Sequence, residues 1–287
     1  MSQSDAPSKQ GGSKAGGGNP QGRADHGLKK NSLGVPSIVF YIIAAASPLT
    51  GVVAIVPIMI GLGNGVGTPG SFLVAAGILL LFAVGYLAMS KHVVNAGALY
   101  SYVTLGLGRV TGLGTAATTI LAYSCIQFSL YGGFGYYLQS LVMKTTGVDV
   151  PWWIFAVVAM LVTLFLGMRG VHAGGIVLGV AICLEIAMLL LLSLGLLNSG
   201  GGSTAPVSEF TFEAFSIPAI FAAGVGISIM FAQTTFIGFE GSAIYSEEAK
   251  NPRRTVPRAT YIALVVMAVV YAGVSYLIIA GLGNENS

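Results

Sequence analysis

Charged residues are scarce in this 287-residue sequence. They make up 8% of it, against about 25% in a soluble domain, while 54% of the residues are hydrophobic and the mean hydropathy is +0.82. So few charges cannot cover a surface that faces water, so lipid must be the solvent for most of the chain. The formal net charge of +3 is modest and gives no indication of nucleic-acid binding.

Residue types that bind metals or carry out catalysis are also few. The two cysteines, Cys125 and Cys183, lie within apolar runs, where thiols behave as small hydrophobes. No set of Cys and His has the spacing of metal ligands. The sequence also lacks a His-Glu-x-x-His motif and a Ser/His/Asp set. We therefore expect no metal, no cofactor and no enzymatic activity.

Apolar runs are missing from residues 1–32, which are rich in Gly, Ser, Gln, Asn and Lys. Such a stretch cannot bury enough apolar surface to offset its ordering entropy, so we predict a disordered tail. The first apolar run begins near Val35 and is too long for the core of a signal peptide. We expect residues 33–283 to form one transmembrane domain.

The rest of the sequence holds apolar runs long enough to cross a bilayer, which takes about 20 helical residues. We predict an all-α polytopic membrane protein with seven transmembrane helices, at about residues 35–62, 71–90, 112–143, 151–168, 174–197, 215–244 and 257–281. Thr255 and Pro257 are expected to start the seventh helix. The mixed stretch from Lys91 to Arg109 is too polar to span and is expected at the membrane surface.

The basic residues predict the orientation. If residues 1–32 are cytoplasmic and the seven spans alternate, 12 of the 13 Lys and Arg residues fall on cytoplasmic segments, and Lys144 alone lies outside. Cytoplasmic loops of membrane proteins carry such an excess. We therefore expect a multi-pass protein of the plasma or inner membrane with a cytoplasmic N-terminus and the lipid bilayer as a partner.

Two of the predicted spans, the first and the sixth, carry helix breakers near mid-membrane. In the first, Pro48 removes a backbone donor and Gly51 weakens the helix further. In the sixth, Gly238 and Gly241 flank Glu240, an ionisable group that lipid disfavours. For the first span an ordinary proline kink and a discontinuous, ligand-binding helix both stay open.

The spacing of the two broken spans indicates a relation between them. They are five helices apart and so run in opposite directions, as do corresponding helices of inverted repeats. Broken helices are tolerated in lipid only where the freed backbone lines a cavity or is buried in protein. Freed N–H groups suit anions and freed carbonyls suit cations, so an α-amino acid fits the pair.

Three more polar residues lie inside predicted spans. Glu185, in the fifth, should face the bundle interior because a lone carboxylate in lipid is costly. A functional role and a structural hydrogen bond are both open for it. Tyr123 and Gln127 lie one turn apart on one face of the third span, facing either a cavity or a neighbouring helix.

Motifs around the sixth span add a resemblance. Phe236-Ile-Gly-Phe-Glu240 and Glu247-Glu-Ala-Lys-Asn-Pro-Arg-Arg-Thr-Val-Pro-Arg-Ala259 closely resemble the sixth-helix and loop signature of amino-acid permeases of the amino acid–polyamine–organocation superfamily. Weaker matches are the break at Pro48 and Gly51, residues 95–102, and residues 169–185. The resemblance covers residues 33–283. It implies a LeuT-like inverted-repeat fold with broken helices 1 and 6, complete in its first repeat and incomplete in its second.

The resemblance also implies a central substrate site. The carboxylate of the substrate would be held by the backbone of the first break, at Ala46, Ser47, Pro48, Leu49, Thr50 and Gly51. Its amine would be held near the sixth break, at Phe236, Ile237, Gly238 and Phe239. Phe236 or Phe239 is implied as an aromatic gate, with helix packing as the alternative. Glu240 and Glu185 are candidates for proton coupling or for a structural role.

The implied function is secondary active transport of amino acids across the plasma membrane, with proton-coupled uptake as the leading hypothesis. Exchange of amino acids or amines and a non-transporting truncated paralogue or subunit are the alternatives. Relatives of this type have ten core helices, usually twelve in all. We therefore expect the sequence to represent the N-terminal part of such a permease, with a C-terminal half as a partner if the protein is split.

Overall fold

The structure is a computed structural model that describes residues 33–93, 97–168, 171–198 and 212–282. Within these ranges the chain is helical almost throughout and forms no strands. Five helices are long and apolar enough to cross a membrane, over Val35–Leu62, Gly65–Ser90, Arg109–Thr146, Val177–Asn198 and Pro252–Gly281. The chain is therefore an all-α polytopic membrane protein. The predicted tail, residues 1–32, lies outside the described residues. So do the first residues of two of the weaker matches, those at 95–102 and 169–185.

The first predicted span is broken where the sequence indicated. It consists of α1 (Val35–Ala46), α2 (Pro48–Thr50), a π-helical turn η1 (Gly51–Ile55) and α3 (Val56–Leu62). Ser47 separates α1 from α2 with φ 48° and ψ 74°, a left-handed conformation that is strained for a residue with a side chain. Pro48 has no N–H to donate back into α1, so the helix stops there.

The next four predicted spans are unbroken. A short turn η2 (Gly65–Gly67) leads into α4 (Thr68–Ser90), and α5 (Ala98–Leu107) occupies the stretch expected at the membrane surface. The helices α6 (Arg109–Thr146) and α7 (Trp152–Met168) then form a hairpin, and α8 (Val171–Asn198) follows. With 17 residues, α7 is short for a straight span.

The sixth predicted span is divided more than the sequence indicated. It consists of η4 (Phe212–Phe215), α9 (Ile217–Ile220), α10 (Val225–Thr235) and η5 (Phe239–Glu247), so residues 215–244 are not one helix. Gly238, with φ 110°, lies between α10 and η5. The second half is a 3-10 helix of nine residues. Runs of this length are uncommon, so tertiary contacts must stabilise this one.

The last helix, α11 (Pro252–Leu282), begins five residues before the expected start at Pro257. The carbonyl of Asn251 accepts the N–H groups of Arg254 at 2.9 Å and Thr255 at 2.8 Å, which closes the first turn. Pro252 occupies the first helical position, where a missing N–H costs nothing. Thr255 and Pro257 are therefore inside the helix rather than at its start.

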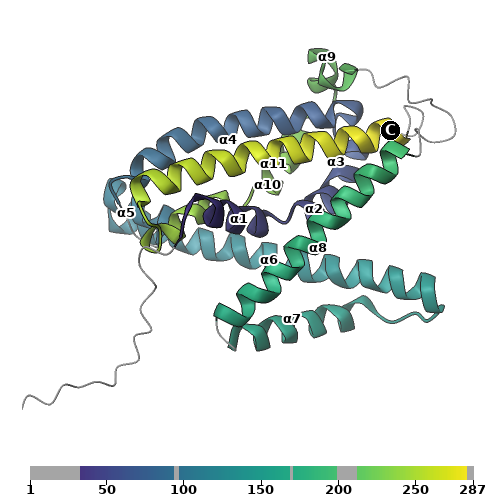
Figure 1. The fold of residues 1–287 in the computed structure, drawn as a ribbon, viewed down its shortest axis with the longest axis horizontal. Helices are drawn as coiled ribbons and strands as arrows, with labels where there is room; N and C mark the ends of the chain where they lie inside the picture. The colour runs from purple at the N-terminus through teal and green to yellow at the C-terminus, as the bar shows by residue number, and fades with distance from the viewer. Residues whose placement is uncertain (1–32, 94–96, 169–170, 199–211, 283–287) are drawn as a thin grey trace, which may run out of the picture.

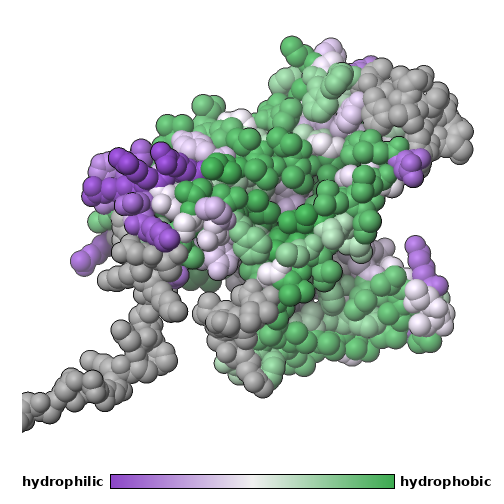
Figure 2. All heavy atoms as spheres, viewed as in Figure 1, coloured by the Kyte–Doolittle hydropathy of each residue, from purple (hydrophilic) through white to green (hydrophobic). Residues whose placement is uncertain are grey.

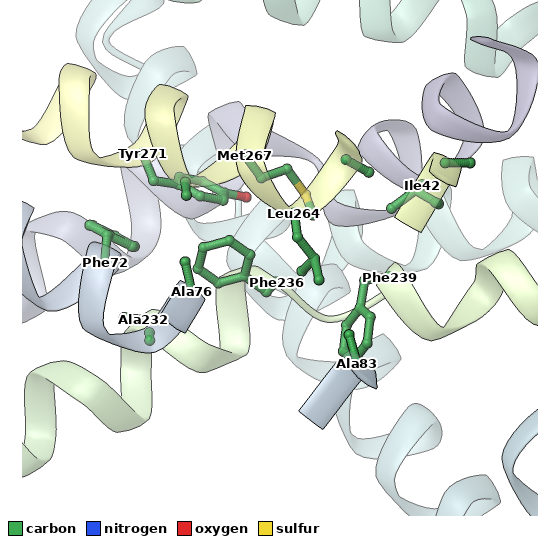
Figure 3. Close-up of a cluster of buried hydrophobic side chains, with 14 of the residues drawn as sticks. Ile42, Phe72, Ala76, Ala83, Ala232, Phe236, Phe239, Leu264, Met267 and Tyr271 are labelled. Atoms are coloured by element: carbon green, nitrogen blue, oxygen red, sulfur yellow. The ribbon is translucent and has the colours of Figure 1, made fainter. Parts of the chain in front are cut away.

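The helices α1, α4, α10 and α11 form the packed centre of the fold (Figure 1). The hairpin of α6 and α7 lies to one side, and α8 crosses obliquely from the end of α7 towards the end of α11. The central side chains are buried, and those labelled in Figure 3 come from all four helices and, with Phe236 and Phe239, from the second break. Alanines at 76, 83 and 232 let these helices approach closely.

The two broken spans lie antiparallel and are joined at both ends. At one end, the N–H of Leu33 donates to the carbonyl of Glu248, and the N–H of Lys250 donates to the carbonyl of Leu33, both at 3.0 Å. At the other end, the N–H of Asn64 donates to Ser228 Oγ at 3.0 Å. The start of each broken span therefore lies beside the end of the other, as the spacing of five helices predicted.

Asn64 connects three elements at the second of these junctions. Its side-chain amide donates to Ser71 Oγ and to the carbonyl of Ile220, both at 2.8 Å, and its Oδ1 accepts from Ser228 at 2.7 Å. The residue is 6% exposed, so these bonds replace water. A buried asparagine with this many partners fixes the register of the two spans.

Apolar side chains cover most of the visible surface, and hydrophilic residues gather at one end of the bundle (Figure 2). The segments that meet there are the end of α4, the helix α5, and the start of α11 (Figure 1). These segments and the first residue of α6 carry six of the described basic residues, Lys91, Arg109, Lys250, Arg253, Arg254 and Arg258. Lys144 lies near the far end of α6.

Replacing Asn64 by alanine is expected to destabilise the fold. The change removes the amide group that donates to Ser71 Oγ and the oxygen that accepts the hydroxyl of Ser228, and each buried polar group left unpaired costs about 1–3 kcal/mol. Thermal unfolding of the detergent-purified protein should show a lower Tm. The control is Asn198→Ala, at the exposed end of α8, which should leave the Tm unchanged. Equal Tm values for both variants would contradict the assigned role of Asn64.

Candidate functional site

The breaks of the two spans are in contact with each other. A Cβ atom added to Gly238 would lie 3.0 Å from Ala45 Cβ and 3.4 Å from the nitrogen of Ala46. The break of the sixth span thus packs against the last turn of α1, directly before Ser47. The two groups of residues that the resemblance assigned to one site are therefore brought together, although about 190 positions separate them in sequence.

The first break has free backbone donors because of its sequence. Ser47 leaves the helical conformation and Pro48 has no N–H, so the N–H of Leu49 is the first donor after the break. That N–H donates to Glu185 Oε1 at 2.5 Å, and Ser47 Oγ donates to the same oxygen at 3.0 Å. Glu185, on α8, is thus turned towards the break, as expected for a carboxylate inside a span.

A third polar group completes this arrangement. Ser47 Oγ lies 2.9 Å from Thr50 Oγ1. Because the single hydroxyl proton of Ser47 is directed at Glu185, Thr50 is the donor to Ser47. The donors of the first break therefore converge on one carboxylate oxygen.

Gly51 follows in close contact with two other elements. A Cβ at this position would lie 2.8 Å from Tyr271 Cε1 and 3.2 Å from Thr235 Cγ2. Tyr271, on α11, is fully buried and donates its hydroxyl to the carbonyl of Thr235 at 2.9 Å. It thereby satisfies a carbonyl at the end of α10 while packing on the first break. The sequence analysis missed Tyr271, whose only signal was a tyrosine within an apolar span.

Glu240 holds the second break together. Its Oε2 accepts the N–H of Gly238 at 3.0 Å, and its Oε1 accepts the hydroxyl of Tyr123 from α6. Its backbone carbonyl accepts the hydroxyl of Tyr86 from α4 at 2.7 Å. A single residue thus ties the broken span to two neighbouring helices.

Phe236 and Phe239 are packed in the core (Figure 3). The ring of Phe236 meets Tyr271 edge to face with 5.5 Å between centroids, and Phe239 contacts Tyr86 and Phe82. The carbonyl of Phe236 accepts the N–H of Phe239 at 3.3 Å. Within the described residues the carbonyl of Ile237 accepts no hydrogen bond, so it is the free acceptor at this break.

Tyr123 and Gln127 border an open hollow on α6. Its volume is about 470 Å³, and its lining comes from one helix, at Thr119, Ile120, Tyr123, Ser124, Gln127 and Phe128. Tyr123 connects this hollow to Glu240, while Gln127 lies one turn further along the same face. Tyr123 thus borders this open hollow and also bonds to the broken sixth span.

Comparison with known proteins gives a consistent result. The sequence profile of the family described as "Amino acid permease" matches residues 33–287. A branched-chain amino acid permease, BcaP, of Lactococcus lactis is 25% identical over 75% of this chain and 49% of its own length. A methylthioribose transporter of Bacillus subtilis is 26% identical over 81% and 51%. A low-affinity putrescine importer, PlaP, of Escherichia coli is 23% identical over 77% and 48%. The chain spans about half the length of these curated relatives.

Replacing Gly238 by alanine is expected to disturb the contact between the breaks. The φ of 110° is strained for any residue with a Cβ, and that Cβ would press on Ala45, so we expect a loss of about 1–3 kcal/mol in unfolding free energy. Gly241→Ala is the matched control, because the space beside Gly241 is open. The measurement is the Tm of both variants. A Gly238 variant as stable as the control would show that the observed backbone is not required.

Proposed function

Because this chain belongs to the amino acid permease family, whose members are transporters and not enzymes, we propose that it carries out secondary active transport of amino acids across the plasma membrane, with proton-coupled uptake. The relatives named above transport branched-chain amino acids, putrescine and methylthioribose, so amino acids and related small molecules are the substrate range considered.

One observation carries this proposal, namely the contact between two breaks of opposite chemistry. The first break offers Leu49 N–H and the Ser47 hydroxyl, which already hold a carboxylate, that of Glu185. The second break offers the free carbonyl of Ile237 beside Glu240. An α-amino acid carries an anion and a cation on one carbon, so its two ends match two adjacent breaks.

The antiparallel pairing supports a transport cycle. Transporters with broken helices expose a central site to each side of the membrane in turn by rocking one group of helices against another. Here the broken spans are joined at both ends by Leu33 and Asn64, so the pair would move as a unit against α6 and α8. Glu185 and Glu240 are carboxylates inside the spans, and Glu185, which bonds across helices through one oxygen, would carry the coupled proton.

The distribution of basic residues supports the orientation. The end of the bundle that carries Arg253 and Arg254 would face the cytoplasm, and Leu33, the first described residue, pairs with Lys250 at that end. The end of α6 near Lys144 would face outwards.

Uptake of radiolabelled L-leucine into proteoliposomes tests the proposal. An inward proton gradient should accelerate uptake several-fold, and dissipating the gradient should remove the acceleration. Counterflow into vesicles preloaded with L-leucine distinguishes the alternatives, since exchange that needs no gradient would favour an antiporter. The proposal would be overturned if the folded protein took up none of L-leucine, L-arginine and putrescine and none of them raised its Tm. That result would favour a non-transporting role.

Tyr123→Phe is expected to slow uptake. The change removes the hydroxyl that donates to Glu240 while keeping the ring, and a hydrogen bond to a charged group is worth about 1.5–3 kcal/mol, so we expect a loss of about tenfold or more. The control is Tyr137→Phe, exposed on the same helix, which should transport normally. Initial uptake rates at matched protein amounts give the comparison. Equal uptake rates for both variants would show that transport does not depend on the hydrogen bond between Tyr123 and Glu240.

A further inference from the structure

The donors of the first break are already occupied by a group of the protein itself. Leu49 N–H and the Ser47 hydroxyl both point at Oε1 of Glu185, and Thr50 supports Ser47 from behind. A carboxylate seated on these donors is direct evidence that they bind carboxylates. It also means that a substrate carboxylate assigned to the same donors must displace Glu185 first.

We propose that Glu185 links proton binding to substrate binding by competing with the substrate's carboxylate for Leu49 N–H and Ser47 Oγ–H. This inference rests on the proposed function, because it concerns the same site. Two carboxylates cannot share one set of donors while both are ionised, because like charges at this distance strongly disfavour the doubly charged state. Binding of an amino acid therefore requires that Glu185 takes up a proton or moves away.

One oxygen of the Glu185 carboxylate is left on which a proton can bind. Its Oε1 accepts both hydrogen bonds, and Oε2 accepts none from the described residues, so a proton has an oxygen on which to bind. Once protonated, the carboxyl group is neutral and its hold on the two donors weakens, since hydrogen bonds to ionised acceptors are roughly twice as strong. The proton balance is one proton gained at Glu185 for each carboxylate bound, and one lost when the substrate leaves.

Few titratable groups of the helices packed against α8 lie near Glu185. From α11 the titratable group near it is Tyr271, whose hydroxyl is already donated to Thr235. The tyrosine of α1, Tyr41, instead stacks on Tyr245. The described parts of α2 and α7 contain no titratable residue. Across the part of the chain that the structure describes, no Lys, Arg or His forms an ion pair with Glu185.

This competition distinguishes two kinds of ligand. A ligand with a carboxylate must displace Glu185, so its affinity depends on the protonation of that residue. A ligand with the same side chain and amine but a neutral amide in place of the carboxylate does not compete as an anion. L-leucine and L-leucinamide form such a pair, and the amine of L-leucinamide stays largely protonated below about pH 7.

The test is a titration of both probes against the purified full chain between about pH 5 and pH 7, with binding followed by calorimetry. For the unmodified protein the Kd of L-leucine should rise towards tenfold per pH unit, as a single linked proton requires, while the Kd of L-leucinamide stays constant. Glu185→Gln should bind L-leucine with a Kd that no longer changes with pH. Glu213→Gln, an exposed carboxylate outside the breaks, should behave as the unmodified protein does.

A second measurement needs no variant. In difference infrared spectra the unmodified protein should gain the band of a protonated carboxyl group when L-leucine is added, and not when L-leucinamide is added. An L-leucine Kd that does not vary with pH, or the same band with both probes, would overturn the inference and leave the proposed function standing. Failure of both probes to bind at any pH would overturn the proposed function, and the inference with it.

Discussion

The need to satisfy backbone groups inside a membrane is the constraint on which the rest of this fold depends. A helix that stops at Ser47 or at Gly238 leaves polar groups that lipid cannot hydrogen-bond, so each break must be buried in protein or line a cavity. The fold meets this requirement by placing the two breaks against each other. Asn64 at one end and Leu33 at the other then fix the antiparallel register that keeps them in contact.

Side chains from three other helices, and Glu240 of the broken sixth span itself, complete the hydrogen bonding of the breaks. Tyrosine hydroxyls donate to backbone carbonyls: Tyr271 donates to the carbonyl of Thr235, and Tyr86 donates to the carbonyl of Glu240. Carboxylates accept from backbone N–H groups: Glu185 accepts from Leu49, and Glu240 accepts from Gly238. The two acidic residues that are costly in lipid thus lie where free donors offset that cost. The backbone groups that would bind a zwitterion are the ones that the breaks leave without a partner within the helix.

Local chemistry decided which of these features the sequence could predict. Pro48 and Gly238 change the backbone at their own positions, so the sequence alone predicts where both breaks lie. The contact of Glu185 with Leu49 joins residues 136 positions apart, and no spacing rule predicts it. Asn64 and Tyr271 were missed for the same reason, since only the packing of distant spans makes them central. The start of α11 was misplaced because Asn251 closes its first turn.

The two carboxylates at the breaks, Glu185 and Glu240, differ in how firmly they are held. Glu240 has both oxygens occupied, one by the N–H of Gly238 two residues away and one by Tyr123, so moving it would open its own chain segment. Glu185 reaches the first break from a separate helix and uses one oxygen. Losing that contact frees two donors but leaves α8 itself intact. A residue bonded within its own break suits a structural role, whereas one that bonds across helices through a single oxygen suits exchange with a ligand.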